Sequence, residues 1–250
     1  MRDILATCIQ KHSDRALVKF LRDYSRVPAV STMYGTAFEN FALRRLMVGG
    51  KFPIKRLKDK DATVLDTSSR KTPLGLSRGF LRFPRSAIQR HPCLATLADA
   101  VLAATRLRCN GDKSSITSRA ALFVPLSKSF CCVDAIVPAP IGTEPYSFFL
   151  ANATTDVTHS IKISDHRSTG GSTEYSGGLG AIMDKLYSSA DGDSDVCMLW
   201  LVPPRVYAAM SFASPFRMDV PMKKREDRIS AMADYPVCKR VVQYALCVDL

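Results

Sequence analysis

The sequence predicts one α/β domain built around a mixed central sheet of about four to five strands. Two observations carry this prediction. Segments with helical and strand periodicity follow one another along the chain, and 250 residues that are 46% hydrophobic and 23% charged are enough for one sizeable core. No window holds the roughly 18 uninterrupted apolar residues that a membrane-spanning helix needs, and no signal peptide is visible at the start. We expect a single domain over residues 1–250 that does not bind a membrane.

Helical spacing marks the beginning of the chain. Apolar residues recur with this spacing at positions 17–21, and Pro28 marks the exit from a first helix. Ser31 or Thr32 can cap a second helix, and the Gly49-Gly50 pair is a stop signal for it. The segment 51–57 then alternates apolar and basic residues, as a strand with one solvent-exposed face does.

Residues 58–120 have a looser pattern, which we interpret as a basic insertion that carries a short helix at residues 94–106. This section is dense in arginine, and Phe80 and Phe83 are interleaved among the charges. Such a mixture is typical of surfaces that hold phosphates while stacking bases, although a solvated basic loop has the same composition. The candidate nucleic-acid-binding residues are Lys55, Arg78, Arg82 and Arg85.

The second half of the chain carries the clearest strand signals. Proline and glycine at residues 138–145 predict a hairpin between two of these strands, residues 173–187 predict a helix, and residues 228–233 predict a shorter one. The predicted strands are residues 121–126, 132–137, 146–153, 196–202 and 241–248. The expected parts are an N-terminal helix in 1–30, a core of 31–57 and 121–207, the basic insertion 58–120 and a C-terminal extension 208–250.

Charge points to a polyanionic partner. Thirty-five Lys and Arg residues against 23 Asp and Glu give a net charge of +12 and a pI near 9.5, which makes nucleic acid the first partner to consider. The alternative is a basic composition that serves solubility alone. None of the eight cysteines shows C-x-x-C spacing, so we expect reduced thiols rather than a zinc or redox site.

Polar residues inside apolar segments are the candidates for chemistry. Asp134 lies at the start of a predicted strand, and Asn152 and Thr154 lie on one face of the next because strand side chains alternate. Glu39 lies in the predicted second helix. Metal-dependent nucleases hold Mg²⁺ with oxygen ligands on adjacent strands, and Asp134 supplies one such carboxylate. The alternatives are an exposed helix charge for Glu39 and strand-end hydrogen bonds for Asn152 and Thr154.

Four stretches of the sequence carry a family resemblance: YGTAFENFALRRLMVGGKFPIKRL, FCCVDAIVPA, FFLANATTDVTHSIK and MLWLVPPRVY. They resemble signature segments of the C-terminal domain of Crinkler effectors and of retrotransposon hot spot proteins. That domain belongs to the PD-(D/E)xK restriction-endonuclease-like superfamily, so the resemblance implies a restriction-endonuclease-like core and Mg²⁺-dependent hydrolysis of DNA. The positions that match the family pattern are Glu39, Asp134, Asn152, Thr154, His159 and Lys162. The resemblance implies that Glu39, Asp134 and Asn152 are the metal ligands.

Two departures from the superfamily pattern favour a second interpretation. Asn152 stands where the superfamily has Glu or Gln, and Thr154 stands where it has a catalytic Lys, so Lys162 or Lys55 would have to assist the attacking water. The alternative function is therefore an inactive nuclease fold that binds DNA, chromatin or a protein. The resemblance also implies a secreted, modular parent protein that acts in the nucleus of a host cell on host nuclear proteins or DNA. The KKR run at residues 223–225 agrees with a nuclear destination.

Overall fold

The chain was analysed in a computed structural model that describes residues 2–24, 31–58, 72–109, 121–126, 133–140, 142–144, 146–162, 166–169, 172–175, 178–187, 196–213, 216–217 and 241–250. The predicted helix at 228–233 and the basic run at 223–225 lie outside these residues.

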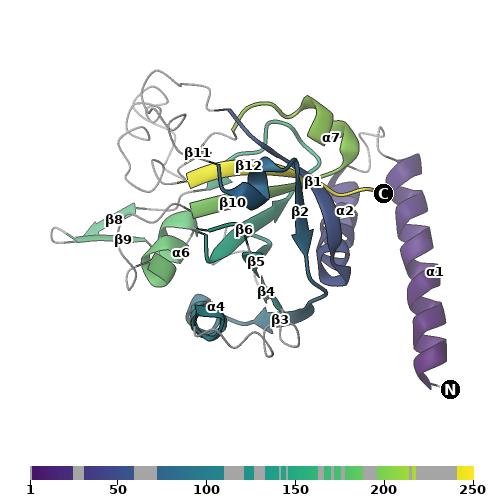
Figure 1. Cartoon of the computed structure of the whole chain (residues 1–250), viewed down its shortest axis with the longest axis horizontal. Helices are drawn as coiled ribbons and strands as arrows, with labels where there is room; N and C mark the ends of the chain where they lie inside the picture. The colour runs from purple at the N-terminus through teal and green to yellow at the C-terminus, as the bar shows by residue number, and fades with distance from the viewer. Residues whose placement is uncertain are drawn as a thin grey trace.

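A curled, mixed sheet forms the centre of the molecule, and the α/β prediction is confirmed (Figure 1). Its central strands β12, β10 and β6 are parallel, whereas β1, β2 and β5 run antiparallel to their neighbours. Strand β4 is antiparallel to β5, and β3 is parallel to β4. In spatial order the strands are β2 (Phe80–Phe83), β1 (Gly50–Arg56), β12 (Val241–Cys247), β10 (Val196–Val202), β6 (Phe148–Ala153), β5 (Ala135–Pro138), β4 (Ala121–Pro125) and β3 (Ala87–His91).

The prediction of four to five strands is wrong, because this sheet has eight. Both extra edge strands, β2 and β3, come from the segment that the sequence analysis interprets as a basic insertion. In β2, Leu81 and Phe83 are buried and alternate with exposed Phe80 and Arg82. Four residues are too short a run for periodicity to be distinguished from an arginine-rich loop. This segment therefore supplies both edges of the sheet.

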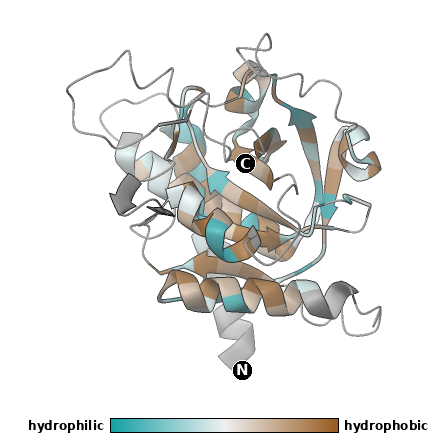
Figure 2. Cartoon of the chain, turned by 90° about the vertical axis from the view of Figure 1, so that its left-hand side faces the viewer, coloured by the Kyte–Doolittle hydropathy of each residue, from teal (hydrophilic) through white to brown (hydrophobic). Residues whose placement is uncertain are grey.

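Helices cover both faces of the sheet (Figure 1). On one face, α2 (Ser31–Val48) and α3 (Leu74–Ser77) pack against a first core, with α1 (Arg2–Asp23) outside α2. On the other face, α4 (Leu94–Cys109), α6 (Gly178–Tyr187) and α7 (Pro204–Ala209) pack against a second core. Hydrophobic residues concentrate on the central strands between these layers (Figure 2). None of the described helices is both long and apolar enough to cross a membrane.

Glycine explains where α2 ends. Gly49 has φ +78°, and its N–H reaches the carbonyl oxygens of Arg45 and Leu46, as at a left-handed helix end. A Cβ at this position would lie 2.7 Å from the carbonyl carbon of Pro84. The chain after β2 therefore passes directly beside Gly49, and the predicted stop of α2 is confirmed.

Two other predictions need correction. The strand predicted from residue 132 begins at Ala135. The helix predicted from residue 173 begins only at Gly178, because β9 (Ser172–Tyr175) pairs with β8 (His166–Thr169) as a small hairpin. Gly178 has φ +69°, which gives this turn its shape before the helix. A second small sheet pairs β7 (Ile161–Lys162) with β11 (Phe216–Arg217).

Candidate nucleic-acid interface and strand-end site

The strand-end site consists of Asp134, Asn152 and Thr154, where β5 begins and β6 ends. Asp134 is 6% exposed, and its Oδ2 accepts a hydrogen bond of 2.7 Å from the backbone N–H of Ala153. Its own N–H donates to the carbonyl of Ala151 at 2.9 Å. Strand β5 starts only at Ala135, so the Asp134 carboxylate adds one hydrogen bond to β6 beyond the end of the β5–β6 pairing. This side chain therefore has a structural partner that justifies its burial.

Two of the predicted metal ligands, Asn152 and Glu39, come from opposite sides of the sheet. Ala151 and Ala153 pack into the first core, so the intervening Asn152 lies on the face of the second core, where it is 9% exposed. Glu39 lies on α2, which packs against the first core. Strand alternation thus places Asn152 and the helix that carries Glu39 on opposite sides of the sheet.

The third residue of the strand-end site has a local role. The Thr154 hydroxyl accepts a hydrogen bond from the N–H of Asp156 at 3.1 Å and donates to its carbonyl at 3.3 Å. Asp156 in turn accepts from the N–H and hydroxyl of Thr158, and these bonds, the backbone one foremost, hold the pKa of Asp156 below its ordinary value. Thr154 therefore shapes the turn that follows β6.

His159 lies near this site because it contacts Trp200, a residue that the sequence analysis did not single out. The His159 ring is exposed and lies edge-on to Trp200, with 5.4 Å between centroids. Trp200 is fully buried, pairs with Asn152 across β10 and β6, and donates from Nε1 to Gln243 Oε1 at 2.8 Å. The sequence feature that could have indicated this buried hydrogen bond is Gln243, a glutamine within the apolar run of the last strand.

Lys55 does not reach the strand-end site. Across the sheet, Lys55 pairs with Ala245, Ala245 pairs with Trp200, and Trp200 pairs with Asn152. Three inter-strand steps correspond to roughly 14 Å. Lys55 Nζ lies instead 4.8 Å from the centroid of the Tyr207 ring, and partial burial lowers the pKa of Lys55. The register therefore places Lys55 three strands away from Asn152.

The backbone of Lys162 lies in β7, but its side chain falls outside what the structure describes. Within the described ranges, no group of three or more His, Cys, Asp and Glu side chains is placed to hold a metal ion. The predicted ligands Glu39, Asp134 and Asn152 are two carboxylates and one amide, so they are not a group of this kind. Asp134 Oδ2 already accepts a hydrogen bond from the Ala153 N–H, and Glu39 comes from the helix layer on the other side of the sheet from Asn152. A Mg²⁺ site shared by Glu39, Asp134 and Asn152 therefore stays a prediction.

A second surface, which we call the basic face, lies on β1 and β2. In β1, Phe52 and Ile54 are buried in the first core, so Lys51, Pro53 and Lys55 point to the opposite side. Lys51 is exposed and lies directly opposite the exposed Arg82 of β2. The basic face consists of Lys51, Lys55, Arg78, Phe80, Arg82 and Arg85.

Among the described residues, the cations of this face are not paired with acids. Segments 50–58 and 72–91 include no Asp or Glu, and among the described residues none of the five cations forms an ion pair. Arg78 ends α3 just before β2, and Arg85 follows β2 beside Gly49. Lys51 Nζ lies 3.4 Å from the centroid of Phe80, whose side chain is 37% exposed. Lys51 is the member that the sequence analysis left out, because only strand pairing shows that it faces Arg82.

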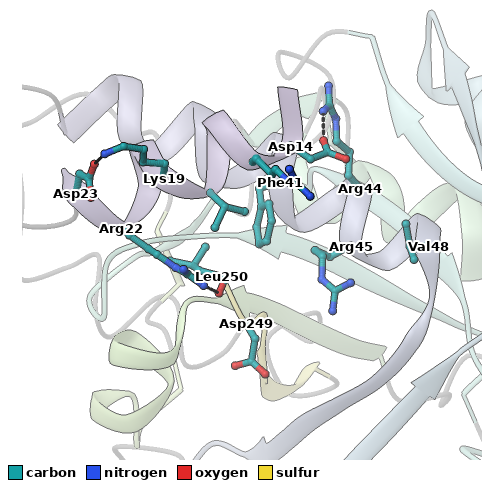
Figure 3. A pocket seen from close by; sticks show the side chains of 12 residues that line it. Asp14, Lys19, Arg22, Asp23, Phe41, Arg44, Arg45, Val48, Asp249 and Leu250 are labelled. Atoms are coloured by element: carbon teal, nitrogen blue, oxygen red, sulfur yellow. Dashed lines mark hydrogen bonds and ion pairs between the residues drawn. The ribbon is translucent and has the colours of Figure 1, made fainter. Parts of the chain in front are cut away.

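Two cavities border α1. The first, of about 750 Å³, lies between α1, α2 and the segment after β12 (Figure 3). Two of its five cations form ion pairs with acids: Arg44 bonds to Asp14 at 2.7 Å, and Lys19 bonds to Asp23 at 2.5 Å. The second cavity, of about 540 Å³, lies at the carboxyl ends of β6 and β10. Arg22, which donates to the Leu250 carbonyl, lines both.

Comparison of the chain with protein-family models, with curated proteins and with solved structures finds no match in any of the three.

Proposed function

We propose that this chain binds nucleic acid, with DNA as the first ligand to test, through the basic face. The observation that carries the proposal is the pairing of Lys51 with Arg82 on the exposed side of two strands that contain no acid. Like charges directly opposite each other in a sheet are destabilising. A phosphate backbone would relieve this repulsion and release counterions, which makes binding favourable and dependent on salt.

The aromatic member of the face supports contact with bases as well as phosphates. Phe80 lies opposite Pro53 in the ladder and is partly exposed, while Lys51 covers its ring. A base that stacks on an exposed aromatic ring contributes about 1–3 kcal/mol. The combination of Phe80 with flanking cations therefore fits a strand that is at least partly unpaired.

A second candidate function is Mg²⁺-dependent hydrolysis by a restriction-endonuclease-like domain of the Crinkler type, acting in a host nucleus. The convergence of Asp134 and Asn152 at adjacent ends of β5 and β6 favours it. The hydrogen bonds that engage Asp134 and Thr154 favour instead the inactive alternative, in which a similar fold only binds DNA, chromatin or a protein partner. We rank binding without cleavage first.

The binding proposal is tested by fluorescence anisotropy with labelled single-stranded and duplex DNA across a salt series. Lys51→Glu with Arg82→Glu is expected to lower affinity at least tenfold and to reduce the salt slope by about 1 for each phosphate that the variant no longer neutralises. The matched control is Arg90→Glu with Lys185→Glu, which makes the same charge change at exposed positions on β3 and α6. Equal losses of affinity in the two double variants would show that net charge alone acts, and would refute the basic face.

Hydrolysis is tested by incubating plasmid DNA with and without Mg²⁺, using Asp134→Asn beside the original chain. The asparagine keeps an oxygen that can accept the Ala153 N–H but removes the carboxylate charge. Cleavage that requires Mg²⁺ and disappears in this variant would establish the second candidate. Binding without cleavage in any metal would leave the inactive alternative.

A further inference from the structure

The cavity at the carboxyl ends of β6 and β10, which we call the Tyr34 cavity, combines apolar walls with few polar groups. Its volume of about 540 Å³ lies within the range of small-molecule sites, and the carboxyl ends of parallel strands are where such sites form in α/β sheets. Its lining comes from α1, α2, the turn after β6 and the start of α7. None of the residues of the strand-end site or of the basic face contributes to this lining.

A tyrosine hydroxyl without a partner among the described residues marks this cavity as a binding site. Tyr34 is 7% exposed and lines the cavity, yet its hydroxyl makes no hydrogen bond to any of these residues. The hydroxyl oxygen itself is not enclosed, because among the described residues the only fully enclosed side-chain N or O atom without a partner is His91 Nε2. The hydroxyl is therefore a donor available to a molecule within the cavity.

The charges around this hydroxyl favour an anion. Arg205 lies close enough to Tyr34 for its charge to offset part of the rise that burial causes in the pKa of the phenol. Within the described part of the chain, Arg205 forms no ion pair, and Arg22 lines the same cavity. Asp156 is the opposing charge, so among the lining residues two arginines stand against one side-chain carboxylate.

We propose that the Tyr34 cavity binds a small phosphomonoester with a flat apolar part, such as a mononucleotide. The phosphate is held by Arg205 and the Tyr34 hydroxyl, with Arg22 adding positive charge. The flat group lies against the walls that Pro203, Pro204 and Val206 provide.

The proposal is tested by isothermal titration calorimetry on the whole chain, with AMP, adenosine and inorganic phosphate as separate probes. AMP is expected to bind at least tenfold more tightly than either adenosine or phosphate. Tyr34→Phe removes only the hydroxyl and is expected to lower AMP affinity about tenfold, as is usual for a hydrogen bond to a charged group. Arg205→Ala is expected to lower it at least as much, while the exposed Arg90→Ala on β3 leaves it unchanged.

Three results would overturn the proposal: no AMP binding at millimolar concentration, adenosine binding as tight as AMP, or AMP affinity unaffected by Tyr34→Phe and Arg205→Ala. Inorganic phosphate binding as tightly as AMP would refute the part played by the apolar walls. Near-ultraviolet circular dichroism of each variant verifies that it is folded. The proposal is independent of the basic face, since the Lys51→Glu, Arg82→Glu variant is expected to bind AMP normally.

Discussion

The side chain of Asp134 accepts a hydrogen bond from the backbone N–H of Ala153, 19 residues later in the chain, at 2.7 Å. The carboxylate thereby takes the place of a main-chain carbonyl at the point where β5 has not yet begun. A residue that its sequence context marks as a candidate metal ligand thus also closes the end of the sheet.

This hydrogen bond predicts the stability of two Asp134 variants. Asp134→Ala leaves the buried Ala153 N–H without its acceptor and is expected to lower the free energy of unfolding by about 1–3 kcal/mol. Asp134→Asn keeps an acceptor oxygen and is expected to cost less. Urea unfolding measures both, with the exposed Asp99→Ala as a control expected to change stability by about 0.5 kcal/mol or less. An Asp134→Ala variant as stable as this control would contradict the structural role.

Alkaline conditions are expected to destabilise the fold. Burial raises the pKa of Cys247 from 9.0 to about 12 and that of Tyr244 from 10.0 to about 12. Both groups therefore keep their protons in the folded chain at pH values where the unfolded chain loses them. Their contribution is fully present below pH 9 and is lost as pH rises toward 12.

Urea midpoints measured from pH 8 to pH 11 test this prediction. Cys247→Ala and Tyr244→Phe are each expected to flatten the decline, whereas Tyr24→Phe, at an exposed position, leaves the slope as it is. The slopes are compared rather than the absolute stabilities, because the Tyr244 hydroxyl also bonds to Thr72 and Tyr146. A decline that is equally steep in all variants would contradict the assignment.

Thiol reactivity is expected to differ sharply between the described cysteines. Cys93 is exposed before α4, and hydrogen bonds with the backbone and the hydroxyl of Thr96 lower the pKa of its thiol. Cys197 is buried, and burial raises the pKa of its thiol well above the ordinary value. Because the thiolate is the nucleophile, iodoacetamide is expected to label Cys93 much faster than Cys197 at neutral pH.

Peptide mass spectrometry over time measures these labelling rates. Thr96→Val removes the hydroxyl but keeps the backbone donor, so it is expected to slow the labelling of Cys93 without abolishing it. Equal rates for Cys93 and Cys197 in the folded chain would show that this description of the two thiols is incorrect.

Apolar packing rather than ion pairing is expected to hold α1 in place. Leu21 is fully buried in the first core, whereas the Asp14–Arg44 ion pair of α1 and α2 is substantially exposed (Figure 3). Leu21→Ala is expected to cost about 2–5 kcal/mol, and Asp14→Ala less than about 1 kcal/mol. Hydrogen exchange along α1, together with urea unfolding, compares the two. A larger loss of stability in Asp14→Ala would contradict this ranking.

Long periodic segments were predictable from the sequence. The apolar run VCMLWLV is β10, and the second predicted helix is α2, which ends before Gly49 as expected. The edge strands β2 and β3 were not predictable, because each is only four or five residues long and their basic residues resemble a loop. Of the residues on the basic face, Arg78, Arg82 and Arg85 were found from composition, while Lys51 required the pairing of β1 with β2.

The sequence alone determined the type of most elements and the positions at which polar residues interrupt apolar strands, since both depend on neighbours two to four residues apart. Only the tertiary structure decided which polar groups meet. It joins Asp134 to Ala153 and Trp200 to Gln243, and it separates Lys55 from Asn152 by three strands. Such pairings form between segments far apart in the chain, and the packing of both cores on the whole sheet selects them.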